Sequence, residues 1–122
     1  MGGAPDPKPR RREVDRPALA RARLVHRTCA VCGRQAGGVH HVVPRGQRGG
    51  DVDENLVGLC GDGTRGCHGA VHGTPYERGG RRREPAEVRA ALLSHLLAQR
   101  PDVVAYADAR MGRGYLERRY GT

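Results

Sequence analysis

The four cysteines form two pairs whose spacing is typical of a metal site. Cys29 and Cys32 form a CxxC knuckle followed by glycine, a turn that aims two thiolates at one point. Cys60 and Cys67 enclose the glycine-rich segment GDGTRG, which can fold back on itself. Two such pairs, about 28 residues apart, predict a structural zinc ion with four cysteine ligands, although the second spacing is wider than in a standard zinc ribbon. Two disulfides or unpaired core thiols are the alternatives, and a reducing compartment disfavours the disulfides.

Four of the six histidines also occur in two pairs, interleaved with the cysteines. His40 and His41 are adjacent in a short β-branched run. Neighbours on a strand point to opposite faces, but at a strand end one can reach a metal while the other faces a substrate. His68 and His72 are four residues apart, which places both imidazoles on one face of a helical turn and suits a shared metal. The histidines outside this pattern, interpreted as ordinary surface or core residues, are His26 and His95.

Short elements must position these groups. Residues 39–43 predict a strand, which Pro44 and Gly46 end, and residues 55–60 predict the returning strand. Residues 18–27 are compatible with a helix, and residues 85–100 show a helical apolar stripe. A weaker helix is predicted over 102–111. The stripe of the longer helix consists of Val88, Leu92 and Leu96.

The order of these groups resembles an HNH endonuclease. The stretch HHVVPRGQRGG…NLVGLCGDGTRGCHGAVH is similar to small HNH proteins of actinobacterial phages and prophages, and the resemblance covers about residues 26–76. It implies an α+β fold: a small ββα-metal (His-Me finger) core with a zinc knuckle and flanking helices. The matching residues, in chain order, are Cys29, Cys32, His40, His41, Asn55, Cys60, Cys67, His68 and His72.

The resemblance also implies a role for each residue. His41 takes the position of the general base, and an imidazole suits that task at neutral pH. Asn55 takes the position of the residue that orients this base, although it also reads as a turn residue. A catalytic divalent ion, Mg²⁺ or Mn²⁺ by preference and Ni²⁺ or Zn²⁺ as alternatives, is implied beside the scissile phosphate. Its expected ligands are His40, His68 and His72.

The charge balance favours a polyanionic partner. Lysine and arginine number 22 against 13 acids, for a net charge of +9, and all but one of the basic residues are arginine. The arginine side chain matches phosphate bidentately, although a GC-rich genome would also enrich arginine over lysine. Arg45 and Arg48, in the loop after His41, are expected to contact DNA phosphates. No segment approaches the roughly 18 apolar residues of a membrane span, and no signal peptide is evident, so a cytoplasmic protein of a bacterial host cell is expected.

The length of 122 residues indicates a single domain, and the composition indicates a weak core. There is no Phe or Trp, so Leu, Val and Ala must fill the interior, and a zinc ion would compensate for their small buried area. Residues 1–17 predict a disordered basic arm, which either contacts phosphates or serves as a solubilising tail. Residues 18–76 predict the nuclease core, and residues 77–122 a basic linker over 77–83 followed by C-terminal helices.

The sequence therefore predicts a metal-dependent DNA endonuclease that nicks DNA, or cuts both strands if it dimerises. The expected oligomeric state is a monomer or a weak homodimer. The alternative from another class is a zinc-stabilised, non-catalytic nucleic-acid-binding module. The resemblance further implies a role in phage DNA packaging with the terminase large subunit. The C-terminal helices would then serve as the docking surface, unless they form the domain's own core.

Overall fold

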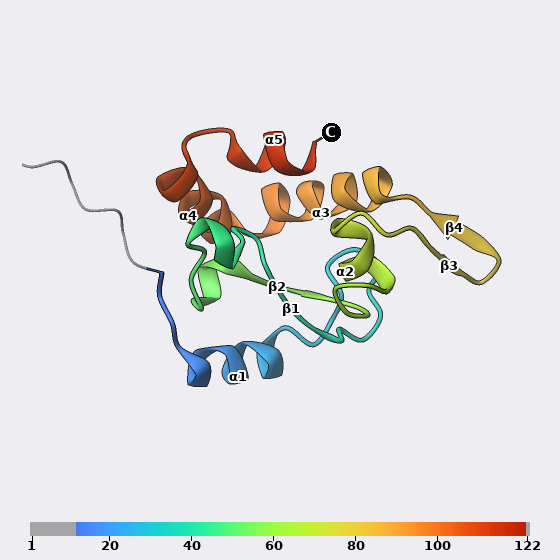
Figure 1. The fold of residues 1–122 in the computed structure, drawn as a ribbon, viewed down its shortest axis with the longest axis horizontal. Coiled ribbons are helices and arrows are strands. Elements are labelled where there is room, and N and C mark those ends of the chain that lie inside the picture. Colours follow the sequence, from blue (N-terminus) through green and yellow to red (C-terminus); the bar gives the residue numbers. More distant parts are fainter. Residues whose placement is uncertain (1–11, 122) are drawn as a thin grey trace, which may run out of the picture.

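The computed structural model describes residues 12–121, which form a mixed α/β fold (Figure 1). Within this range there are five α-helices and two antiparallel sheets of two strands each. The helices are α1 (Arg16–Val25), α2 (Gly66–Val71), α3 (Pro85–Gln99), α4 (Pro101–Met111) and α5 (Tyr115–Tyr120). The strands are β1 (Gly38–His41), β2 (Leu56–Leu59), β3 (Tyr76–Arg78) and β4 (Arg81–Arg83). This architecture agrees with the predicted α+β class.

The β1–β2 pair lies between α1 on one side and helices α3–α5 on the other (Figure 1). Its register sets His40 opposite Val57 and His41 opposite Leu56. Successive side chains of β2 point to opposite faces of the strand pair. Val57 and Leu59 belong to the main core, whereas Leu56 packs with α1. Both faces of this short pair are therefore covered.

The predicted apolar stripe of α3 forms the centre of the main core. Val88, Leu92 and Leu96 are completely buried. They pack with residues of α4 and α5, including Tyr115 and Tyr120, so tyrosine supplements the expected Leu, Val and Ala. Because the stripe is buried within the domain, a terminase or another partner would have to bind other surfaces.

Ordered structure begins closer to the N-terminus than the sequence predicted. The Asp15 carboxylate accepts a hydrogen bond from the Ala18 amide, 3.0 Å away, and this N-cap starts α1 at Arg16. Arg12 and Glu13, which fall within the predicted disordered arm, contact the loop at residues 49–51. The other residues of the predicted arm, 1–11, lie outside the described residues.

The segment predicted as a basic linker is a β-hairpin in the structure. Strands β3 and β4 pair from Tyr76 opposite Arg83 to Arg78 opposite Arg81. Gly79 and Gly80 form the turn with φ angles of 61° and 74°, which a two-residue hairpin turn of this kind requires. The hairpin projects from the body of the molecule beside α2 (Figure 1). The sequence did not predict these strands, because the run of arginines lacks the alternation of apolar and polar residues that indicates a strand.

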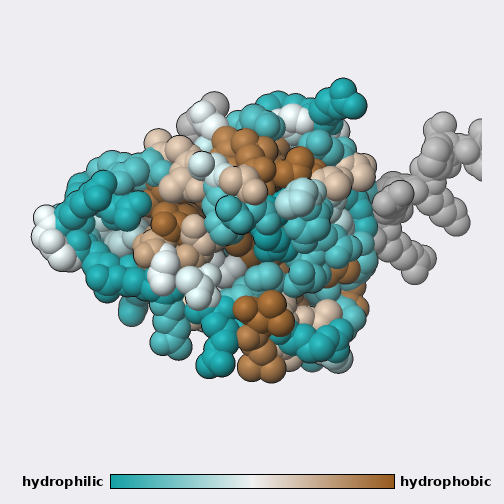
Figure 2. Space-filling model, turned by 180° about the vertical axis from the view of Figure 1, so that it is seen from behind, coloured by the Kyte–Doolittle hydropathy of each residue, from teal (hydrophilic) through white to brown (hydrophobic). Residues whose placement is uncertain are grey.

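The surface is largely hydrophilic on the face that Figure 2 shows, with apolar areas interrupted by polar groups. Large apolar side chains exposed in the described part of the chain are Val14, Leu24, Val25 and Leu97. No helix among residues 12–121 combines the length and apolar character needed to cross a membrane.

Candidate metal centres

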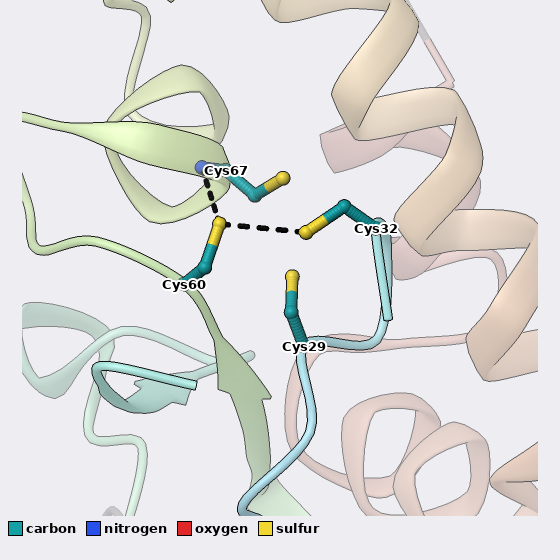
Figure 3. Close-up of side chains that lie close together, drawn as sticks. All are labelled: Cys29, Cys32, Cys60 and Cys67. Carbon is teal, nitrogen blue, oxygen red and sulfur yellow. Dashed lines mark hydrogen bonds between the residues drawn. The ribbon is translucent and has the colours of Figure 1, made fainter. Parts of the chain in front are cut away.

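The four cysteine sulfurs converge on one point between the knuckle, the end of β2 and the start of α2 (Figure 3). All four Sγ atoms lie within 4.8 Å of one another, and those of Cys32 and Cys60 are 3.6 Å apart. Tetrahedral zinc with Zn–S bonds of about 2.3 Å requires sulfurs about 3.8 Å apart. The cluster can therefore hold a metal such as zinc with little rearrangement.

Three donors from nearby elements point at these sulfurs. The Cys67 amide lies 3.4 Å from the Cys60 sulfur, at the first turn of α2. Arg78 directs its guanidinium to the sulfurs of Cys32 and Cys60, at 3.5 and 3.6 Å. The Tyr76 hydroxyl lies 3.0 Å from the Cys67 sulfur. Tyr76 and Arg78 are two apart on β3 and reach the same cluster, so the hairpin covers it and offsets part of its negative charge.

The thiols influence one another's ionisation. A hydrogen bond from Cys67 lowers the pKa of Cys29 to about 4, and the same hydrogen bond raises the pKa of Cys67. Burial raises the pKa of Cys32. One thiolate thus forms readily, but further thiolates beside it are unfavourable unless a cation neutralises them. This charge balance fits a resident divalent metal.

A second cluster consists of three imidazoles from β1 and α2. His40 is buried on β1, and its Nδ1 lies 3.3 Å from Nε2 of His68. His72 follows α2 directly, and its ring centroid is 5.0 Å from that of His68 and 5.3 Å from that of His40. One ring nitrogen from each residue lies within 4.8 Å of the others, so one ion can bind all three.

A buried tyrosine determines which nitrogen of His40 faces the cluster. His40 Nε2 lies 2.9 Å from the Tyr120 hydroxyl, and that hydroxyl is 3.2 Å from the Val42 carbonyl. Because a carbonyl only accepts, Tyr120 donates to Val42 and accepts from His40. The His40 proton is therefore on Nε2, and Nδ1 presents its lone pair to the cluster. Such an outer partner fixes the tautomer of a metal-binding histidine.

The three imidazoles are held in their neutral form. Burial lowers the pKa of His40, His68 and His72. The mutual repulsion of the rings and the positive charge of Arg119 act in the same direction on His40. Neutral imidazole is the form that binds metals.

His41 faces a separate partner, a buried carboxylate. Its Nε2 lies 2.9 Å from Oδ1 of Asp51. Arg12 also bonds Asp51 Oδ1, and the Asp15 amide donates to the other oxygen at 3.0 Å. Burial opposes ionisation of Asp51, but the bond from His41 and these donors outweigh it and lower its pKa. The carboxylate thus accepts a hydrogen bond from the N–H at His41 Nε2 and leaves Nδ1 with a free lone pair.

Asn55 ties the loop after β1 to the start of β2. Its amide oxygen accepts from the Val43 amide at 2.7 Å, and its Nδ2 donates to the carbonyls of Val43 and Gly50. A Cβ at Gly49 would lie 1.6 Å from the Val43 carbonyl oxygen, so only glycine fits there. These bonds hold the two ends of the loop that carries Asp51.

The histidines line a pocket of about 320 Å³. Of the two arginines predicted to contact phosphate, Arg45 lines this pocket, whereas Arg48 is not among its lining residues. Arg23 of α1 and Arg119 of α5 also line it. The pocket thus contains four imidazoles and three guanidinium groups, and it can receive a phosphate.

Sequence reasoning did not identify Asp51 and Tyr120 as site residues. The acid follows two glycines in a loop ten residues after His41, a weak local signal for a partner of the histidine. Tyr120 is 80 residues from His40, and no spacing rule connects them.

Comparison with known proteins gave no significant match: no family model, curated protein or solved structure is similar to this chain. The two clusters are therefore interpreted from their own geometry.

We expect the cysteine cluster to retain one zinc ion per chain after dialysis, with Arg78 strengthening retention. Arg78→Ala should weaken zinc binding by about 10- to 100-fold, the usual cost of losing an outer partner of a metal ligand. Competition with a chromophoric chelator measures this change. Arg82→Ala is the matched control, because Arg82 lies on the same hairpin but pairs with Glu84. A folded Cys60→Ser protein with normal melting and zinc content would contradict the assignment.

The histidine cluster should bind one additional divalent ion in the zinc-loaded protein. Titration calorimetry with Ni²⁺, which binds imidazole strongly, should show one site that His68→Ala abolishes. Tyr120→Phe should weaken metal binding at this site by about tenfold, because His40 can then carry its proton on either ring nitrogen. His95→Ala should leave the site unchanged, because His95 lies outside the cluster. Equal Ni²⁺ binding by wild type and His68→Ala would exclude the site.

Proposed function

We propose that this chain is a metal-dependent DNA endonuclease of the HNH type, with a ββα-metal core formed by β1, β2 and α2. The observation that carries the proposal is the convergence of His40, His68 and His72 beside His41 in one arginine-lined pocket. A nuclease needs a metal site, a base and cationic groups at one phosphate, and this pocket contains residues suited to each task.

The order of elements supports the same proposal. The strand pair β1–β2 is followed by α2, and the functional histidines lie at the end of β1 and on or just after α2. Asn55 immediately precedes β2 and bonds the loop after His41. This arrangement is the one that the resemblance to HNH endonucleases implies for the first histidine pair, the asparagine and the later histidines.

In the proposed reaction, His41 Nδ1 accepts a proton from the attacking water. Asp51 holds the imidazole in the required tautomer and stabilises the imidazolium that forms. The water oxygen bonds to phosphorus while the bond to the 3′ oxygen breaks, and that oxygen takes a proton from solvent. Arg45 contributes positive charge at the phosphate. His40, His68 and His72 would hold a divalent ion, which would supply charge neutralisation in this reaction.

The alternative function is a zinc-stabilised, non-catalytic nucleic-acid-binding module. The cysteine cluster and the net charge of +9 support it, because both would serve binding alone. It assigns no task to the Asp51–His41 pair or to the histidine cluster. A supercoiled-plasmid assay with each of Mg²⁺, Mn²⁺ and Ni²⁺ distinguishes the two functions, and intact plasmid under every condition would favour the binding module.

For the nuclease we expect His41→Ala to reduce plasmid nicking by about 10²- to 10⁴-fold, the usual contribution of a general base. His95→Ala serves as the control, since this histidine lies away from the pocket. Gel quantification of nicked and linear DNA over time gives the rates. Nicking by His41→Ala at the wild-type rate would show that another group acts as the base.

Asp51→Asn should lower kcat while changing KM less than twofold. The amide keeps the size of the side chain but no longer requires the proton on His41 Nε2, so a fraction of the imidazoles has the wrong tautomer. A loss of about tenfold or more in kcat, at unchanged zinc content and melting temperature, separates positioning of the base from a structural role. Asp62→Asn, at an exposed acid outside the pocket, is the control.

A further inference from the structure

A second pocket of about 330 Å³ adjoins the histidine cluster on the side of the C-terminal helices. It is lined by Val71 and His72 at the end of α2, by Arg89 of α3, and by Arg119 and Tyr120 of α5. Two guanidinium groups and an exposed imidazole thus face one hollow, and no acidic residue among residues 12–121 lines it. The positive charge of this pocket favours the binding of an anion and disfavours the binding of a cation.

Arg119 has unused hydrogen-bonding capacity in this pocket. Its Nε is buried and has no hydrogen-bond partner among the described residues. The guanidinium lies over the Tyr120 ring, 5.0 Å from the ring centroid, which orients the planar group. A buried donor without a partner is costly, so the packing around Arg119 leaves part of its hydrogen-bonding potential unmet.

Arg89 is oriented by a different contact. Its Nε donates to the Val71 carbonyl at 2.9 Å, so the side chain is anchored at the end of α2. The terminal NH groups have no hydrogen-bond partner in the described part of the chain. One terminal nitrogen lies near Gly73, where it is 3.7 Å from the position that a Cβ would occupy. Arg89 therefore presents fixed donors to the same hollow as Arg119.

The two pockets share His72 and Arg119 as lining residues, so they lie next to each other. The histidine cluster lines the first pocket together with Arg23 and Arg45, and Arg89 lines the second. Two adjacent pockets that both carry cationic groups suit a chain of phosphates rather than one isolated phosphate. Two arginines that each present a planar donor fork are also the usual means of binding phosphate bidentately.

We propose that Arg89 and Arg119 form a subsite for a backbone phosphate of nucleic acid, next to the phosphate at the histidine cluster. The subsite deepens the proposed nuclease function and rests on it for the identity of the ligand. It places the strand across the two adjacent pockets, from Arg45 past His72 to Arg89. It also gives the C-terminal helix α5 a direct part in binding, beyond its role in the core.

DNA binding measured without cleavage tests the subsite separately from the nuclease activity. Full-length, zinc-loaded protein carrying His41→Ala is titrated into a fluorescein-labelled duplex, and anisotropy is followed between about 50 and 200 mM salt. Adding Arg119→Ala or Arg89→Ala should weaken binding by about tenfold and reduce the salt slope by about one, the effect of losing one phosphate contact. Arg119→Lys should keep most of the salt slope, because it retains the charge.

Arg113→Ala is the matched control, since Arg113 is exposed just before α5 and lines neither pocket. It should change affinity less than twofold. An equal loss in Arg113→Ala and Arg119→Ala would overturn the subsite, because diffuse charge alone would then explain binding. So would unchanged binding in Arg119→Ala, or no DNA binding by the parent protein.

Zinc content and melting temperature are measured for every variant, and Arg119→Gln with Arg89→Gln decides the outcome if an alanine variant unfolds. Loss of binding in these two variants supports the subsite, and full binding by both overturns it. If wild-type protein leaves plasmid intact while Arg119→Ala loses DNA binding, the nuclease proposal fails and the phosphate subsite stands.

Discussion

The mutual approach of four thiols is the constraint on which the arrangement of this chain depends. The sulfurs join the knuckle before β1, the end of β2 and the first turn of α2, and the hairpin covers them through Tyr76 and Arg78. Cys67 and His68 are consecutive, so whatever holds the thiol cluster together also places His68 against β1. A core without Phe or Trp buries modest area, and a shared cation at the thiols would supply the missing stability. The position of the cysteine cluster therefore determines where His68 of the histidine cluster lies.

The loop between β1 and β2 is held by polar contacts rather than by apolar packing. Asn55, at the end of this loop, bonds the backbone of Val43 near the start and of Gly50 in the middle, and Gly49 allows the close approach that those bonds need. Asp51 is then fixed in a buried position, where the N-terminal segment supplies Arg12 as a further partner. Unpaired, such a carboxylate would be costly to bury. The segment before α1 is therefore part of the candidate site, although its composition is that of a disordered tail.

Two adjacent histidines acquire different chemical roles from their different partners. The Tyr120 hydroxyl leaves the Nδ1 lone pair of His40 facing two other imidazoles, which suits a metal ligand. The Asp51 carboxylate gives His41 a charged partner that stabilises a protonated ring, which suits a proton acceptor. Under the proposed function, one dipeptide thus provides both a metal ligand and a general base. The division comes from an acid on a nearby loop and a tyrosine from the last helix.

The amino-acid sequence is sufficient to predict the features that depend on spacing along the chain. It predicted the cysteine quartet, the histidine pairs, the α3 stripe and the approximate strands, because short-range geometry leaves a pattern of fixed period. It missed the β3–β4 hairpin and the order of residues 12–15, where mostly charged residues carry no such pattern. Only the tertiary structure brought Asp51, Tyr120 and Arg119 to the histidines. Single polar contacts between distant segments depend on how the helices pack, and packing has no period that a sequence displays.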